Sequence, residues 1–271
     1  MTHPIIIAAF GTTSRSRLVY EEVDRHLKSR FPGHEIHWAF TSRIVRHQLK
    51  QRRVQTLDPA AAVARLAGQG HAWAVVQSFN IICGHEFHRL VSDVQHPVCR
   101  VSVGHSLLCS QQDHQAAAEA LAPVFERDEN EAVVMVGHGT DHCAWTVYPA
   151  FYHRLAEMYG NRAFGGMIEE GWPSRESVVR RIIDAGFRRV RLMPFMLVAG
   201  VHFEEDLAGP EDSWKAALET QGLEVVLERD ALGRRSAIID ILAGHVCDAL
   251  AVIPSNGAGR PPCRPGKNAM R

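Results

Sequence analysis

Two stretches of the sequence decide its fold class: IIIAAFGTT at residues 5–13 and VVMVGHGTD at residues 133–141. Each is a short run of mostly apolar residues that breaks off at a glycine and a threonine, which is typical of a buried strand that enters a turn. Amphipathic segments follow both stretches, and strand-like and helix-like segments then alternate along the chain. This alternation predicts an α/β protein in which parallel sheets are covered by helices on both faces.

The spacing of apolar residues and of turn residues locates the individual elements. Asp58 and Pro59, for example, are expected to form the N-cap and the first residue of a helix. The predicted strands cover residues 5–9, 35–40, 72–79, 99–103, 132–136, 163–168, 189–198 and 224–228. The predicted helices cover residues 16–30, 42–52, 59–67, 86–94, 111–125, 144–159, 174–185, 212–221 and 237–253.

A second pair of segments indicates that the chain contains two copies of one unit. SFNIICGHEF at residues 78–87 corresponds to PFMLVAGVHF at residues 194–203, so that Glu86 matches His202, while Phe10 matches His138. We therefore expect two similar lobes, each a parallel sheet flanked by helices, with a cleft between them. The predicted lobes cover residues 1–127 and 128–253. Residues 254–271, with four prolines and three glycines and no apolar periodicity, are expected to be disordered.

Composition and charge exclude several classes of function. The 271 residues include 30 Lys and Arg and 30 Asp and Glu, and this balance argues against nucleic acid as the main partner. No apolar run reaches the ~18 residues of a membrane span. The first residues lack the basic region of a secretory leader, so we expect a cytoplasmic protein.

Four ionisable side chains lie after predicted strands, where α/β sheets bind their ligands. Imidazole can bind a metal or accept a proton near neutral pH, and two imidazoles with a carboxylate suit a borderline divalent ion such as Co²⁺, Ni²⁺, Fe²⁺ or Zn²⁺. Of the neighbouring acids at residues 169 and 170, one is expected to point into the cleft and the other away. The four side chains expected to converge on the cleft are Glu86, His138, Glu170 and His202.

Simpler interpretations of these residues stay open. His138 can be a histidine that only bonds a turn, and Glu86 can be an acid that favours the start of a helix. The GTT segment at residues 11–13 can bind an anion through backbone amides, but it has neither the GxGxxG of a dinucleotide site nor the lysine of a P-loop. The basic run at residues 43–53 is either a solvated helix face or a surface that meets carboxylates.

The ordered set of motifs resembles the sirohydrochlorin cobaltochelatases of anaerobic cobalamin biosynthesis, which are small single-subunit chelatases of class II. The similarity runs from about residue 5 to about residue 250, and no single motif carries it alone. The matching segments are AFGT (9–12), AFTS (39–42), QSFNIICGHEF (77–87), MVGHG (135–139), EGWP (170–173), LMPFMLVAGVH (192–202) and DSWK (212–215).

The resemblance implies that two α/β lobes hold a tetrapyrrole between them and that His138 is a metal ligand. It also implies that His138, or a carboxylate close by, accepts a proton. It implies further metal ligands at Glu170 and His202. Co²⁺ would be the substrate metal, Ni²⁺ and Fe²⁺ are the other candidates, and no organic cofactor is expected. The residues assigned to the substrate side are Phe10, Gly11, Thr12 and Glu86; His85, beside this acid, is an extra imidazole that bears on metal preference.

The implied activity is the insertion of Co²⁺ into sirohydrochlorin with release of two protons. His138 and its partners would hold the ion on one side of the ring while strained binding tilts a pyrrole nitrogen toward it. Three alternatives stay open: a ferrochelatase or nickel chelatase acting on a related tetrapyrrole, a two-lobed metal-binding or carrier protein, and a metal-dependent hydrolase. The expected partner is a small-molecule tetrapyrrole without nucleic acid or membrane, and the sequence also allows a homo-oligomer.

Overall fold

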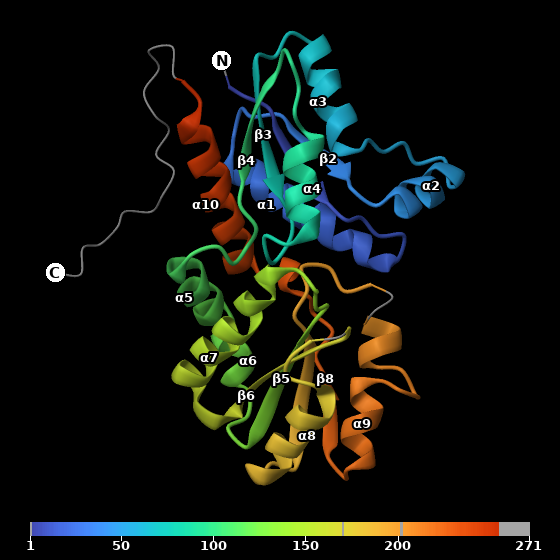
Figure 1. Ribbon diagram of the computed structural model, residues 1–271, viewed down its shortest axis with the longest axis vertical. Coiled ribbons are helices and arrows are strands. Elements are labelled where there is room, and N and C mark those ends of the chain that lie inside the picture. Colours follow the sequence, from blue (N-terminus) through green and yellow to red (C-terminus); the bar gives the residue numbers. More distant parts are fainter. Residues whose placement is uncertain (1, 170, 201–202, 255–271) are drawn as a thin grey trace, which may run out of the picture. The chain divides into compact units, whose positions relative to one another are not determined.

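A computed structural model describes residues 2–169, 171–200 and 203–254 of the chain (Figure 1). The chain divides into two compact units. The first unit holds the described residues of 1–13, 23–107 and 239–271, and the second holds those of 14–22 and 108–238. Within the described residues, no helix is both long enough and apolar enough to cross a membrane.

The first unit contains a four-stranded parallel sheet with the strand order β2-β1-β3-β4. Its strands are β1 (Ile5–Ala9), β2 (Ile36–Phe40), β3 (Trp73–Ser78) and β4 (Arg100–Gly104). The helices that lie wholly or mainly in this unit are α1 (Leu18–Arg30), α2 (Arg43–Gln51), α3 (Pro59–Gly68), α4 (His85–Asp93) and α10 (Ser236–Val252).

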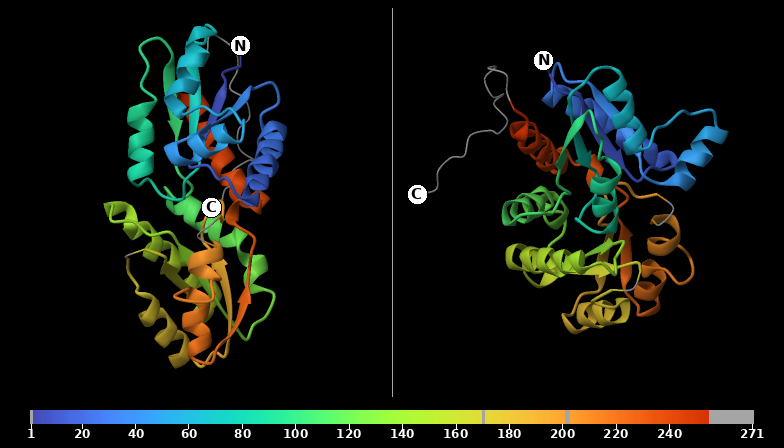
Figure 2. Two further views of the ribbon diagram at one scale, coloured as in Figure 1. Left: turned by 90° about the vertical axis from the view of Figure 1, so that its right-hand side faces the viewer. Right: turned by 45° about the horizontal axis from the view of Figure 1, so that its top comes forward.

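Alternation of apolar side chains along β1 explains why helices cover both faces of this sheet. Ile6 and Ala8 belong to a buried cluster with Leu66 of α3 and Leu90 of α4. Ile7 is also fully buried and points to the opposite face, where α1 and α10 lie (Figure 2). Burial of each large side chain contributes about 1.5–3 kcal/mol, so this central strand anchors the unit.

The second unit repeats the first with the strand order β6-β5-β7-β8, again all parallel. Its strands are β5 (Glu131–Gly137), β6 (Ala163–Met167), β7 (Arg189–Pro194) and β8 (Glu224–Leu227). Its helices are α5 (Gln111–Ala120), α6 (Ala122–Phe125), α7 (Val147–Tyr159), α8 (Arg175–Asp184) and α9 (Trp214–Thr220). The two similar α/β lobes predicted from the sequence are therefore confirmed, with β5 in the place of β1.

Two predicted elements were wrong in extent. The helix predicted over residues 111–125 is interrupted at Leu121, because Pro123 has no N–H and its ring clashes with the preceding turn. The strand predicted over residues 189–198 ends at Pro194, beyond which only Phe195 donates from its backbone to β5. The carbonyls of the next two residues accept hydrogen bonds from residues 232 and 233 instead.

The compact units differ from the predicted lobes in three segments, since residues 14–22 and 108–127 group with the second unit and most of the last helix groups with the first. The boundary predicted after residue 127 leaves α10 in the C-terminal lobe, whereas most of this helix groups with the first unit. The His245 side chain of α10 lies 3.1 Å from the carbonyl oxygen of His105, and Asp240 lies 2.9 Å from His26 of α1. Of the tail predicted to be disordered, residues 255–271 lie outside the described residues.

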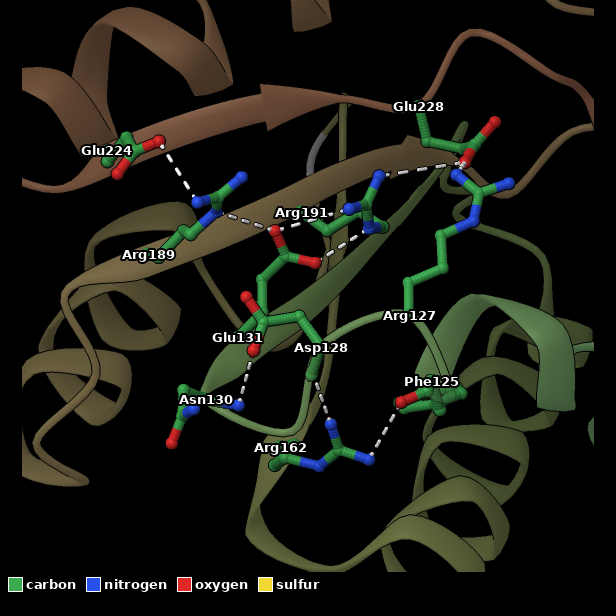
Figure 3. A network of polar contacts seen from close by, with 10 residues as sticks. All are labelled: Phe125, Arg127, Asp128, Asn130, Glu131, Arg162, Arg189, Arg191, Glu224 and Glu228. Atoms are coloured by element: carbon green, nitrogen blue, oxygen red, sulfur yellow. Dashed lines mark hydrogen bonds and ion pairs between the residues drawn. The ribbon is translucent and has the colours of Figure 1, made fainter.

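A buried polar network joins the starts of β5 and β7 in the second unit (Figure 3). The carboxylate of Glu131, which is 1% exposed, accepts from Arg191 Nε at 2.7 Å and from Arg189 Nε at 3.1 Å. Arg127 pairs with the buried Glu228 beside them. Charge-assisted bonds of this kind are strong only where every charge has a partner. The network lies at the opposite end of β5 from His138, about 20 Å away along an extended strand.

Candidate functional site

His138 occupies a sharp turn directly after the central strand β5. The next residue, Gly139, has a φ of 94°, a conformation that residues with a Cβ rarely adopt. A Cβ at Gly137 would lie 2.8 Å from the ring of Tyr148, so α7 approaches the backbone closely on one side of the turn. The His138 side chain is 44% exposed, and it can therefore contact a ligand at the surface of the unit.

Among the described residues, Glu169 is an acid that lies beside His138. Glu169 Oε2 lies 3.6 Å from His138 Nδ1, and the backbone N–H of Glu169 donates to the carbonyl of His138 at 3.0 Å. This contact continues the pairing of β6 with β5 beyond the ends of the strands. At this distance the carboxylate attracts a protonated imidazole by charge but is too far away to hydrogen-bond the ring nitrogen. Glu170 itself lies outside the described residues.

A hollow of about 350 Å³ opens beside the same turn. The indoles of Trp145 and Trp172 line it and are 39% and 62% exposed. Exposed large aromatic side chains around a hollow are typical of surfaces that bind flat, apolar ligands. The hollow is lined by Gly139, Thr140, Asp141, Trp145, Met167, Gly171 and Trp172.

Sequence reasoning assigned no role to either tryptophan of this hollow. Trp172 lies in the EGWP segment, and Trp145 begins no recognisable motif. Each tryptophan follows the end of a strand and does not belong to a regular pattern of apolar residues. This combination could have marked them as candidates for a binding site. Burial raises the pKa of the neighbouring Tyr148 to about 12, so this phenol stays protonated at neutral pH and is no proton acceptor.

The first unit brings the other predicted residues to the carboxyl edge of its sheet. Phe10 follows β1 and is 54% exposed, and Gly11 has a φ of 97° with no room for a Cβ beside Val45. Glu86 lies in the first turn of α4, where the helix dipole favours a carboxylate. The hydroxyl of Thr41 donates to Glu86 Oε2 at 2.9 Å. Thr41 lies in the AFTS motif at residues 39–42, which by itself predicts no role for it.

The basic run after β2 contains two side chains with structural partners. Arg46 donates to the backbone carbonyls of Phe40 and Thr41, and Arg52 donates to the carbonyl of Thr13 at 2.8 Å. These two guanidinium groups therefore hold the backbone of the segments that follow β2 and β1, in addition to facing solvent. The remaining basic side chains of the run, at residues 43, 50 and 53, are exposed.

The predicted three-ligand metal site has one described member. His138 is described, whereas Glu170 and His202 lie outside the described residues. Across residues 2–169, 171–200 and 203–254, no group of three His, Cys, Asp or Glu side chains could hold a metal ion. The assignment of His138, Glu170 and His202 as metal ligands therefore stays a prediction.

Comparison with known proteins places the chain in a family. A family model described as cobalt chelatase (CbiK) matches residues 3–251. The sirohydrochlorin cobaltochelatase CbiKC of Nitratidesulfovibrio vulgaris is 31% identical over 258 residues, which cover 92% of this chain and 91% of the relative. The sirohydrochlorin cobaltochelatase of Salmonella typhimurium is also 31% identical over 258 residues, covering 92% of this chain and 97% of the relative.

Solved structures of chelatases share the fold at low sequence identity. SirB from Bacillus subtilis, solved with Fe³⁺, aligns with a TM-score of 0.66 at 14% identity and covers 93% of this chain and 98% of that one. CbiX, described as the terminal enzyme of siroheme biosynthesis in denitrifying bacteria, aligns with a TM-score of 0.59 at 15% identity, covering 93% of this chain and all of the other. Because the family model spans nearly the whole chain, this protein belongs to the CbiK family of cobalt chelatases.

Proposed function

We propose that this chain is a sirohydrochlorin cobaltochelatase, a lyase that inserts Co²⁺ into sirohydrochlorin and releases two protons in cobalamin biosynthesis. The observation that carries the proposal is the 31% identity over 92% of the chain to two relatives that bear this name. The half-exposed His138 at the end of a central strand supports it, because metal insertion requires an accessible proton acceptor. The proposal includes the cytoplasmic location expected from the sequence.

The chemistry assigns distinct tasks to the residues of the second unit. Sirohydrochlorin loses two pyrrole protons as one divalent ion enters, so charge balances without a redox step. His138 accepts a proton, and the carboxylate of Glu169, 3.6 Å from Nδ1, attracts the imidazolium that forms. Together with Glu170 and His202, His138 holds the incoming ion. Imidazole and carboxylate ligands suit this task because they bind a borderline ion less persistently than thiolates would.

Recognition of the substrate is assigned to aromatic and polar groups that lie after the strands. The hollow beside His138 presents Trp145 and Trp172, whose flat rings suit the face of a tetrapyrrole. In the first unit, Glu86 and the segment from Phe10 to Thr12 follow β3 and β1. We assign these residues to substrate binding, with the exposed basic side chains after β2 as candidates for contact with substrate carboxylates.

An absorbance assay tests the proposed function directly. The purified chain with sirohydrochlorin and Co²⁺ is expected to convert the metal-free spectrum to that of the cobalt complex at a rate that increases with enzyme concentration. Parallel reactions with Ni²⁺ and Fe²⁺ decide whether the chain is instead a nickel chelatase or ferrochelatase. A rate no faster than that of the uncatalysed reaction with every metal would overturn the proposal, and tight retention of the metal without turnover would favour a carrier.

Replacement of His202 with alanine is expected to weaken Co²⁺ binding by at least about tenfold, because a three-ligand site loses an imidazole. Calorimetric titration of the metal alone measures this affinity without reference to turnover. The matched control is His153→Ala, since this α7 histidine is 78% exposed and pairs only weakly with Glu157. An affinity equal to that of the control would remove His202 from the metal site.

A further inference from the structure

Thr41 lies immediately after β2 and forms a hydrogen bond to Glu86. The proposed function assigns Glu86 to substrate binding but gives Thr41 no role. Its hydroxyl donates to Glu86 Oε2 at 2.9 Å, and both side chains are partly buried. The bond has the length of an ordinary O–H···O hydrogen bond. It links side chains from two separate elements, the segment after β2 and the helix α4.

The backbone around Thr41 is held from several directions. The Thr41 N–H donates to the carbonyl of Ala9 at 2.8 Å, and the Phe40 N–H donates to the carbonyl of Leu57 at 2.9 Å. The Arg46 guanidinium of α2 reaches back and donates to the carbonyls of Phe40 and Thr41. Because threonine is also stiff about its first side-chain torsion, the hydroxyl has a fixed position.

Glu86, in contrast, has three side-chain torsions and stands in the first turn of a helix. The residue before this helix is Gly84, which supplies no side-chain cap. A glutamate at such a position samples several rotamers unless a partner selects one. Thr41 is a partner on a different element, so its hydroxyl selects the direction of the carboxylate.

The strand order gives this bond its place in the unit. Thr41 follows β2 and Glu86 follows β3, and β1 lies between these strands in the sheet. The bond therefore spans the carboxyl end of β1, where the segment that begins with Phe10 leaves the sheet. This is also where the strand order reverses direction, the place at which α/β sheets bind ligands.

We propose that Thr41 is a positioning residue that holds the carboxylate of Glu86 in the orientation needed by the substrate. The inference rests on the proposed function and on the assignment of Glu86 to substrate binding. A functional group must be held within about 0.5 Å of its productive position. Loss of the hydroxyl leaves Glu86 in place but lets its carboxylate rotate away.

The first test compares Thr41→Val with Thr41→Ser in the cobalt insertion assay. Valine preserves the shape and removes the hydroxyl, and kcat/KM is expected to fall about tenfold. Serine restores the hydroxyl, and kcat/KM is expected to return to within about twofold of that of the unsubstituted chain. The matched control is Thr2→Val, which removes a hydroxyl bond to the carbonyl of Gly33 at 2.7 Å in the same unit; this variant is expected to keep full activity.

A double-mutant cycle decides whether Thr41 acts through Glu86. Thr41→Val is expected to have less than a twofold effect in a Glu86→Gln background, because the carboxylate that it positions is already gone. An undiminished tenfold effect in that background would overturn the inference, as would an unchanged kcat/KM in Thr41→Val alone. If Thr41→Val folds poorly by circular dichroism, Thr41→Ala takes its place in both comparisons. Absence of turnover in the unsubstituted chain would instead overturn the proposed function.

Discussion

Replacement of His138 with alanine is expected to lower the rate of cobalt insertion by at least about a thousandfold. A positioned proton acceptor contributes 10²–10⁴-fold to a rate, and the same substitution removes a proposed metal ligand. The second unit should stay folded, because the side chain is 44% exposed and fills no part of the buried core. Steady-state absorbance measurements give the rate, and circular dichroism reports on the fold.

The control for this prediction is His153→Ala, which removes a histidine from an exposed position on α7 in the same unit. It is expected to keep the rate of the unsubstituted chain within about twofold. Glu169→Gln is expected to give a rate between those of His153→Ala and His138→Ala, since it keeps a polar side chain near Nδ1 but removes the negative charge. If His138→Ala retained more than a tenth of the rate, His138 would be neither the proton acceptor nor an essential ligand.

Replacement of Glu131 with alanine is expected to have the largest effect on stability, lowering the free energy of unfolding by about 3–5 kcal/mol. Glu131 is 1% exposed, and Arg191 is 10% exposed and donates to both of its carboxylate oxygens (Figure 3). Removal of the acid leaves a buried guanidinium without its main counter-charge, which costs far more than the net contribution of the intact pair. Chemical denaturation followed by circular dichroism measures the change.

Glu224→Ala is the matched control for Glu131→Ala. Glu224 pairs with Arg189 at 3.5 Å, but its side chain is 65% exposed, and exposed pairs contribute at most about 1 kcal/mol. Below its unfolding transition, Glu131→Ala should insert cobalt at the normal rate, because the network lies at the far end of β5 from His138. A stability loss no larger than that of Glu224→Ala would show that water or a moved side chain compensates the buried arginine.

Much of the architecture was predictable because local chemistry specifies it. Residues 5–9 were predicted as a strand and form β1 with the same bounds. Asp58 was predicted as an N-cap, and its side chain accepts from the Ala61 backbone N–H at 2.8 Å. Strand-forming runs, caps and turns depend on neighbours within a few residues. Segments with the same local signals form the same elements, so the repeated segments were enough to infer two similar lobes.

The candidate site was predictable only in part. The strand-end rule selected His138 and Glu86, and the resemblance to the family selected the same positions. The sequence left open whether Glu169 or Glu170 points into the cleft, and it did not indicate that Thr41 would reach Glu86. Both contacts join residues that follow different strands of a sheet, so they depend on strand order and register, which a single sequence does not encode locally.

The sequence by itself determined the alternation of strands and helices, the duplication of the unit, and the residues that end each central strand. These features follow from apolar periodicity, turn chemistry and motifs along the chain. Only the tertiary structure decided which side chains meet at those strand ends: Glu169 with His138, Thr41 with Glu86, and the tryptophans around the hollow. The packing of segments that are distant in the sequence determines these contacts, because strand order brings together the loops and helix ends that follow different strands of one sheet.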